Sequence, residues 1–264
     1  MILADGGEAV DGCWEPYAMR LAMLGTGGYY PSETRHTACM MLPAEGIVLD
    51  AGTGMFRLPR YLQTDQLDIF LTHAHLDHVV GLTYLVGILH GRALAGVTIH
   101  GQADKLAAIQ EHLFSEYIFP VQPTWTFRPL DDETQLPGAG RLTCFPLDHP
   151  GGSVGYRLDW PGHSMAYVTD TTAGADCDYQ RHIGGVDLLL HECNFTDAQA
   201  ALAATTGHSC TTPVATLARQ AAVGRLVLVH VDPTVEGPDP VGLDAARAIF
   251  PATDLAADGM ELDF

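Results

Sequence analysis

The segment that most constrains this chain is Leu-Thr-His-Ala-His-Leu-Asp-His-Val at residues 71–79, which follows a short apolar run. It places four metal-ligating side chains within six positions: His73, His75, Asp77 and His78. In an extended segment, residues i and i+2 project to the same side, so His73 and His75 can bind one ion. The turn that follows lets Asp77 and His78 reach a second ion nearby. Because imidazole and carboxylate are ligands for Zn²⁺ and related divalent metals, the segment predicts a metal site at the end of a buried strand.

Three further candidate ligands follow other apolar runs that we predict to be buried strands. They are His149 after residues 142–147, Asp170 after residues 165–169 and His230 after residues 226–229. A single aspartate at the end of a strand is usually a turn former, so each residue alone would carry little weight. As a set at three strand ends, where a cleft can form, they favour a site shared with residues 71–79.

The order of the predicted elements favours an α/β protein. The first half of the chain is mostly strands followed by helices, and the second half repeats that coarse order. This order fits a two-sheet core with helices on the outer faces better than one parallel sheet. No linker or internal repeat is evident, so we expect a single domain over residues 19–264, preceded by an irregular N-terminal extension over residues 1–18.

The charge balance limits the partners of the protein. Its 264 residues include 13 Lys and Arg against 32 Asp and Glu, a formal net charge of −19, and Lys105 is the only lysine. Long nucleic acids and anionic membrane surfaces are bound mainly through basic side chains, so both are disfavoured. A local basic cleft is still compatible with this net charge.

Targeting signals and disulfides are not expected. The N-terminal segment lacks the basic and apolar regions of a secretory signal, and no run of about 18 uncharged apolar residues occurs. We therefore expect a cytoplasmic protein. The six cysteines form no Cys-x-x-Cys pair, which favours reduced thiols over a disulfide framework or a cysteine-zinc site.

Two glycine-rich segments complete the set of motifs: Gly25-Thr-Gly-Gly after the first predicted strand and Leu49-Asp-Ala-Gly-Thr-Gly before the metal motif. Together with the order His-x-His-x-Asp-His, then His, Asp and His, they resemble the metallo-β-lactamase-fold superfamily of dinuclear metallohydrolases. The resemblance runs from about Met19 to the end of the sequence. It implies an αββα sandwich, in which two mixed β-sheets pack face to face with helices on the outer faces.

The resemblance also implies which residues bind two divalent metal ions. One ion would be bound by His73, His75 and His149, and the other by Asp77, His78 and His230, with Asp170 bridging them. Asp50 would orient one of the metal-binding imidazoles, as partners of this kind usually do. Zn²⁺ is the expected metal, and Mn²⁺ or Fe are alternatives because His and Asp sites accept them too.

Two later segments resemble the ribonuclease Z branch of that superfamily. They are Leu188-Leu-Leu-His-Glu-Cys-Asn-Phe, which contains Glu192, and Gly207-His-Ser, which contains His208. The resemblance implies that Glu192, His208 and Asp77 form a proton relay, in which His208 protonates the leaving oxygen. The residues alone leave other roles open: a structural hydrogen bond for Glu192, and a helix-capping or core imidazole for His208.

The ribonuclease Z branch hydrolyses phosphodiesters, and the resemblance implies attack by a hydroxide that bridges the two metals. Its tRNA-processing members usually carry a long Gly- and Pro-rich arm after the third metal-site segment. Here only 20 positions separate His149 from Asp170, and they read as one tight hairpin around Trp160-Pro-Gly. The armless relatives include small cyclic phosphodiesterases, so we expect a small or cyclic phosphodiester substrate.

Among the armless relatives, the chain is most similar to the phosphoribosyl cyclic phosphodiesterase family. Pro146-Leu-Asp-His and Asp258-Gly-Met-Glu carry this similarity. That family places a cysteine cluster for a structural zinc after the first Gly-rich turn, whereas this chain has Tyr29-Tyr-Pro-Ser-Glu there. Tyr29, Tyr30 and Arg35 are instead candidates for lining the cleft. Arg35 could hold a phosphate or form a structural ion pair.

Three other functions stay open at this point. They are a ribonuclease Z-type tRNA 3′-processing endonuclease, a lactone or thioester hydrolase on the same metal site, and a sensor that retains the site without turnover. As partner we expect a small-molecule phosphodiester substrate, with no long nucleic acid and no membrane. A homodimer is left open.

Overall fold

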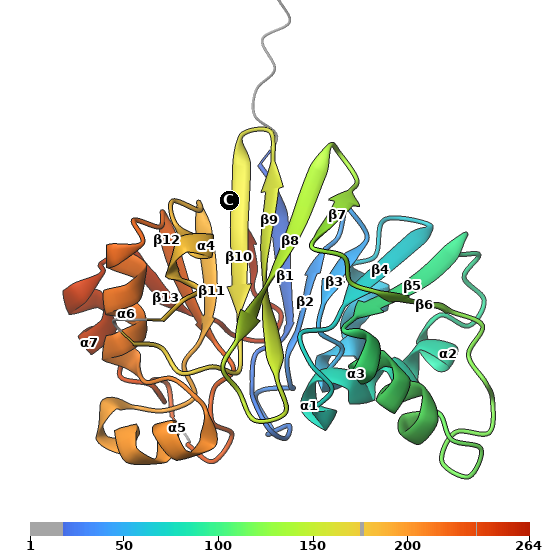
Figure 1. The fold of residues 1–264 in the computed structure, drawn as a ribbon, viewed down its shortest axis with the longest axis horizontal. Coiled ribbons are helices and arrows are strands. Elements are labelled where there is room, and N and C mark those ends of the chain that lie inside the picture. Colours follow the sequence, from blue (N-terminus) through green and yellow to red (C-terminus); the bar gives the residue numbers. More distant parts are fainter. Residues whose placement is uncertain (1–17, 175–176, 236) are drawn as a thin grey trace, which may run out of the picture.

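The computed structural model describes residues 18–174, 177–235 and 237–264. Within them, two seven-stranded sheets pack face to face, and helices cover both outer faces (Figure 1). This confirms the predicted αββα sandwich with two mixed sheets. Of the expected N-terminal extension, residues 1–17 lie outside the described residues.

The first sheet has the strand order β14-β1-β2-β3-β4-β5-β6. Its strands are β1 (Arg20–Gly25), β2 (Cys39–Leu42), β3 (Ile47–Leu49), β4 (Gln66–Phe70), β5 (Gly96–Gly101), β6 (Thr126–Pro129) and β14 (Glu261–Asp263). The pairs from β14 to β3 are antiparallel, and those from β3 to β6 are parallel.

The second sheet has the strand order β13-β12-β11-β10-β9-β8-β7, and it too is half antiparallel and half parallel. Its strands are β7 (Glu133–Leu136), β8 (Gly140–Leu147), β9 (Ser153–Trp160), β10 (His163–Val168), β11 (Leu188–Glu192), β12 (Arg225–Val229) and β13 (Thr253–Leu255). The pairs from β7 to β10 are antiparallel, and those from β10 to β13 are parallel.

The main core lies between the two sheets. On β1, Leu21 and Met23 contribute to it together with Leu190 of the other sheet. The alternate residues Ala22 and Leu24 pack on the other face of the first sheet, under its covering helices. A strand that is buried on both faces needs apolar side chains at consecutive positions, which explains why these strands read as continuous apolar runs in the sequence.

The helices divide between the two outer faces. One flank holds α1 (Leu76–Val79), α2 (Leu85–Ile88) and α3 (Ala103–Ala108), together with the 3₁₀ helices η1 (Thr53–Arg60) and η2 (Val80–Tyr84) and the π-helix η3 (Ile109–Leu113). The other holds α4 (Gln180–Ile183), α5 (Ala200–Thr206), α6 (Thr211–Gln220), α7 (Leu243–Ile249) and η4 (Asp197–Gln199). In the part of the chain that the structure describes, no helix is both long and apolar enough to cross a membrane.

Strand ends position the candidate ligands. His73 follows β4, His149 follows β8, Asp170 follows β10 and His230 follows β12. Side chains at the carboxyl ends of strands can converge at one edge of a sheet, where α/β proteins commonly bind ligands. Four segments that are far apart in the sequence therefore meet there.

Candidate metal centre

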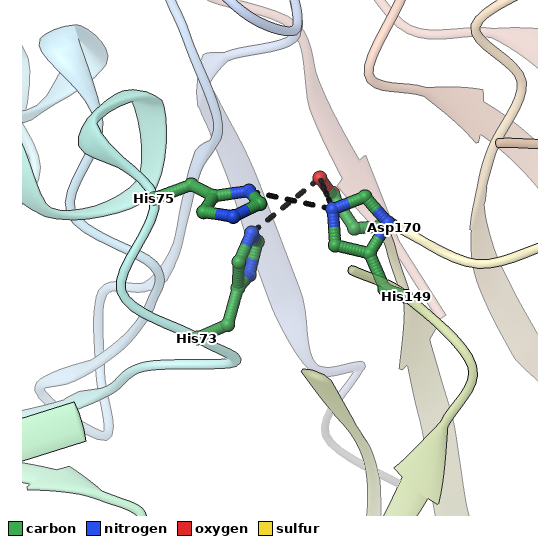
Figure 2. Close-up of side chains that lie close together, drawn as sticks. All are labelled: His73, His75, His149 and Asp170. Carbon is green, nitrogen blue, oxygen red and sulfur yellow. Dashed lines mark hydrogen bonds and ion pairs between the residues drawn. The ribbon is translucent and has the colours of Figure 1, made fainter. Parts of the chain in front are cut away.

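Figure 2 shows that His73, His75, His149 and Asp170 converge on one point. One ligand-type atom of each residue lies within 4.8 Å of the others. Nε2 of His73 and Nε2 of His149 are each 3.5 Å from Oδ2 of Asp170. Nε2 of His149 is also 3.3 Å from Nδ1 of His75. His73 and His75 therefore face the same point, as their spacing predicts.

A second group shares Asp170 with the first and adds Asp77, His78 and His230. Oδ1 of Asp170 lies 3.2 Å from Nε2 of His78 and 3.3 Å from Nε2 of His230. Oδ2 of Asp77 lies 3.3 Å from Nε2 of His230 and 3.4 Å from Nε2 of His78. The two oxygens of Asp170 face different groups, which is the geometry of a carboxylate that can bridge two ions.

The donor set fits two divalent cations. Two ligand atoms that each lie about 2.1 Å from Zn²⁺ at a tetrahedral angle are about 3.4 Å apart. Separations between 3.2 and 3.5 Å recur in both groups. Among the described residues, buried Nε2 of His73 has no hydrogen-bond partner, which is expected of a nitrogen that is free to bind a metal. The donors are imidazoles and carboxylates, a combination suited to Zn²⁺, Mn²⁺ or Fe.

Neighbouring acceptors aim the imidazoles. Nδ1 of His78 donates to Oδ2 of Asp50 at 2.8 Å, and this leaves the lone pair of Nε2 facing the centre. Asp50 is itself fully buried and fixed by Thr72 and by the Tyr167 hydroxyl, which donates to Oδ2 at 2.9 Å. Asp50 thus has the orienting position that the resemblance implies.

The second aimed imidazole is His149. Its Nδ1 donates to the carbonyl oxygen of Gly207 at 3.0 Å. A carbonyl can only accept, so Nδ1 carries the proton and Nε2 presents its lone pair to His75 and Asp170. Gly207 has a positive φ of 76° at the end of α5, and a Cβ there would lie 2.7 Å from Cδ of Pro150. A glycine is therefore required for this contact.

Buried carboxylates make the centre favourable for positive charge. Burial raises the pKa of Asp170, but the imidazoles of His230 and His78 outweigh it and hold that pKa well below its ordinary value. Burial would lower the pKa of His78, but the carboxylates of Asp170 and Asp77 raise it well above its ordinary value. For His73, burial and then the neighbouring His78 lower the pKa well below its ordinary value. The carboxylates thus attract cations, while His73 stays in the neutral form that binds metals.

Four residues at the centre have a positive φ, a backbone conformation that residues other than glycine rarely adopt. The angle φ is 61° at Tyr29, 57° at Asp50, 51° at Asp170 and 57° at His230. Each such residue costs on the order of 1–3 kcal/mol and persists only where its surroundings hold it. For Tyr29 these include a hydrogen bond of 2.8 Å from its backbone N–H to Oδ2 of Asp77. Strain of this kind clusters at functional sites.

Glu192 and His208 lie beside the centre and contact each other. Oε1 of the fully buried Glu192 is 3.0 Å from Nδ1 of His208. The same carboxylate accepts hydrogen bonds from the backbone N–H groups of Thr171, Asn194 and Ser209. The pair that the resemblance implies is present, and so is the structural hydrogen bonding that the sequence left open for Glu192.

The third member of the expected relay, Asp77, is connected differently. The ring of His208 stacks on the ring of His230, with centroids 5.3 Å apart. Nε2 of His230 is in turn 3.3 Å from Oδ2 of Asp77. Among the described residues, no hydrogen bond joins His208 to Asp77. Of the three residues expected to form a relay, Glu192 and His208 therefore contact each other directly, whereas Asp77 is connected to them only through His230.

Arg35 has a structural role. Its Nη1 donates to Oγ1 of Thr26 at 2.7 Å and to the carbonyl oxygen of Ala256 at 2.6 Å. Asp258 accepts from the backbone N–H and hydroxyl of Thr26 and from Nη1 of Arg57. The sequence left open a phosphate ligand or a structural ion pair, and the contacts of Arg35 fit a structural role, but with neutral acceptors in place of the expected carboxylate. These contacts tie the Gly-rich turn after β1 to the segment between β13 and β14.

A pocket of about 510 Å³ opens beside the centre. His75, His149 and His208 line it, and the other lining residues are Tyr29, Pro150, Asn194, Phe195, Leu202, Thr206, Asp232, Pro233 and Thr234. Tyr29 thus lines the cleft as expected, whereas Tyr30 is not among the described lining residues. The contribution of α5 was not predictable from the sequence, because a single apolar residue such as Leu202 on a short helix carries no ligand-type signal.

Comparison with known proteins agrees with this geometry. Residues 46–231 match the family model described as the beta-lactamase superfamily domain. Ribonuclease BN of Escherichia coli is 29% identical, over 91% of this chain and 98% of that protein. The metallo-beta-lactamase fold protein YhfI of Bacillus subtilis has a TM-score of 0.79 at 20% identity, over 94% of this chain and 100% of that one. The short form of human tRNase Z has a TM-score of 0.70 at 25% identity, over 92% of this chain and 98% of that one.

These comparisons confirm the resemblance to the metallo-β-lactamase fold and to its ribonuclease Z branch. They also show a difference in length. The alignment with ribonuclease BN extends over 314 residues, which exceeds the 264 residues of this chain by 50. Ribonuclease BN therefore contains segments that have no counterpart here.

Proposed function

This chain belongs to the beta-lactamase superfamily, and we propose that it is a dinuclear metal-dependent phosphodiesterase that hydrolyses a small or cyclic phosphodiester. The observation that carries the proposal is Asp170, whose two carboxylate oxygens face two separate groups of imidazole and carboxylate donors. Paired cations about 3.5–4 Å apart are the arrangement that enzymes use for in-line displacement at phosphorus.

The proposed ligands are those of the two donor groups. His73, His75 and His149 would hold one cation, Asp77, His78 and His230 would hold the other, and Asp170 would bridge them. When bound, the two cations, proposed to be Zn²⁺ with Mn²⁺ or Fe as alternatives, supply Lewis acidity to the phosphoryl oxygens and lower the pKa of water towards neutrality. The chain keeps the donor nitrogens aimed, since Asp50 fixes His78 and the Gly207 carbonyl fixes His149.

His208 is proposed as the general acid. Its Nδ1 contacts Glu192, so Nε2 is the nitrogen that remains to donate a proton to the departing oxygen. The ring of His208 lies against His149 of one donor group and His230 of the other. A phosphodiester bound between the two groups would therefore have His208 beside it. Glu192 stabilises the imidazolium and holds the ring in place.

A tRNA-processing endonuclease is the second candidate, because ribonuclease BN and tRNase Z are similar to this chain. Two observations support the small substrate instead. β9 ends at Trp160 and β10 begins at His163, so only a two-residue turn joins these strands. The segment between His149 and Asp170 therefore has no room for the long arm of the tRNA-processing enzymes. The net charge of −19 also opposes binding of a long polyanion, which needs many basic contacts.

A substrate panel tests this function. We expect metal-loaded protein to hydrolyse bis(p-nitrophenyl) phosphate and nucleoside 2′,3′-cyclic phosphates. A tRNA precursor, acyl-homoserine lactones and thioesters should be turned over with kcat/KM lower by about 100-fold or more, because their bulk or leaving groups do not suit the site. The variant His75→Ala should lose the phosphodiesterase activity. Its matched control is His163→Ala, which also removes one imidazole, at the start of β10, and should retain the activity. Protein that carries its metals and hydrolyses no phosphodiester would contradict the proposal.

A further inference from the structure

We propose that the pocket beside the metal centre receives the leaving alcohol of the diester and selects an alcohol that is apolar and carries no charge of its own. This inference rests on the proposed function and narrows its substrate class. The substrate would be a diester with a single negative charge, on the phosphoryl group, and an uncharged aromatic or similarly apolar alcohol on the side that departs.

The position of His208 identifies which alcohol enters the pocket. His208 lines the pocket together with His75 and His149 of the candidate centre. Because Nδ1 of His208 contacts Glu192 at 3.0 Å, only Nε2 can donate to a departing oxygen. The group attached to that oxygen must then lie on the same side as His208. The pocket is therefore the place for the leaving alcohol.

Part of the pocket lining is apolar. Pro150, Phe195, Leu202 and Pro233 contribute to it. Leu202 on α5 is a large apolar side chain, and yet 48% of it is exposed. A ligand that removes this apolar surface from water is stabilised by the hydrophobic effect. An apolar alcohol would cover it, whereas a charged group would lose its hydration there.

The charges around the pocket disfavour a second anion. Among the described lining residues, none is a lysine or arginine, and Asp232 carries a carboxylate. Asp232 is 9% exposed, and its Oδ1 already accepts from the backbone N–H and the hydroxyl of Thr234. Nη1 of Arg35, the residue considered as a phosphate ligand, is hydrogen-bonded to Thr26 and Ala256, and Arg35 lines a neighbouring pocket rather than this one. A leaving alcohol with its own negative charge would thus meet a carboxylate and no guanidinium or ammonium group.

Two diesters of similar shape test the selection. Ethyl 4-acetylphenyl phosphate and ethyl 4-carboxyphenyl phosphate share the reacting atoms, but only the second has a charged leaving alcohol. Leu202→Lys places a cation at the pocket rim on the exposed side of α5. Val86→Lys is the matched control, because Val86 is 43% exposed on α2 and does not line the pocket, so the net charge changes equally. The measured quantity is the ratio of kcat/KM for the two diesters, compared among the three proteins so that intrinsic reactivity cancels.

We expect wild type to favour the acetyl diester. Leu202→Lys should shift the ratio towards the carboxylate by about tenfold, and Val86→Lys should shift it by less than about twofold, because Coulomb interactions weaken with distance and are screened by salt. Equal shifts in the two variants, or a wild-type preference for the carboxylate, would overturn the proposal.

Binding of the two alcohols provides a readout without turnover. In ligand-observed NMR, 4-hydroxyacetophenone should bind wild type, and 4-hydroxybenzoate should gain binding in Leu202→Lys only. Equal binding of both alcohols to wild type would overturn the pocket assignment. If the alcohols bind as expected and neither diester is hydrolysed, the pocket assignment holds and the proposed phosphodiesterase function is contradicted.

Discussion

Replacement of Asp170 by asparagine is expected to prevent binding of two cations and to lower kcat/KM for phosphodiesters by about 10³-fold. The two oxygens of Asp170 face His73 and His149 on one side and His78 and His230 on the other. An amide of the same shape lacks the charge and one of the two acceptor oxygens. Since a metal ion supplies several kcal/mol of transition-state stabilisation and about 1.4 kcal/mol corresponds to tenfold, a loss of this size follows. The measurements are the metal content per chain and the rate.

A stability readout separates metal loss from misfolding. A cation at 100 times its dissociation constant stabilises a folded protein by about 2.7 kcal/mol. Wild type should therefore melt at a higher temperature when Zn²⁺ is added, and D170N should not. Asp187→Asn is the matched control, because Asp187 precedes β11 and accepts hydrogen bonds from Ser164 rather than facing a donor group. D170N protein that binds two metals with wild-type affinity would show that Asp170 is not the bridge.

Replacement of His208 by alanine is expected to slow the hydrolysis of diesters with alkyl leaving groups by about 10²–10⁴-fold, the usual contribution of a general acid. The same change should slow p-nitrophenyl diesters much less, because p-nitrophenolate departs without a proton. The metal content should not change, since His208 belongs to neither of the two groups around Asp170. The dependence of log kcat on the pKa of the leaving alcohol measures this directly.

His163→Ala is the control for the loss of one imidazole. His163 begins β10 at the end of the strand away from Asp170, and its ring lies near Phe264. It should keep the wild-type rates with every leaving group. If His208→Ala reduced all diesters by the same factor, His208 would act through substrate binding or through the structure around Glu192, and the general-acid role would be wrong.

The candidate ligands were predictable because each has a signal in the sequence. His73 and His75 are spaced two apart after an apolar run, and His149, Asp170 and His230 each follow another such run. Strands buried on both faces produce apolar runs that are easy to recognise, so the ends of β4, β8, β10 and β12 could be placed closely. The two-sheet arrangement followed from the order of these runs and from the family resemblance.

Other features depend on tertiary contacts that have no local signal. β7 has no apolar run that would predict it, because Glu133 and Gln135 are exposed, Thr134 is partly buried and only Leu136 is buried. The pocket wall formed by Phe195 and Leu202 depends on how α5 sits beside the centre. The role of Arg35 was open, because its partners Thr26 and Ala256 are distant in sequence or bind through the backbone. The positive φ values at Asp170 and His230 appear only in the folded chain.

The acidic composition is compatible with a phosphodiester substrate. A protein with a net charge of −19 has few basic side chains with which to bind a phosphate. In the proposed site the cations would provide that positive charge, and Asp77 and Asp170 are among the acidic residues that would hold them. One phosphodiester group would therefore need no arginine or lysine in the proposed site, whereas the net charge would disfavour a long polyanion.

Titration of metal-free protein with Zn²⁺ tests the central claim most directly. The protein is stripped of metal, and the rate of bis(p-nitrophenyl) phosphate hydrolysis is followed as Zn²⁺ is added stepwise. A dinuclear site predicts that the metal-free protein is inactive and that the rate reaches its plateau at two equivalents per chain. Full activity without metal, a plateau at one equivalent, or no activity with two equivalents bound would contradict the account.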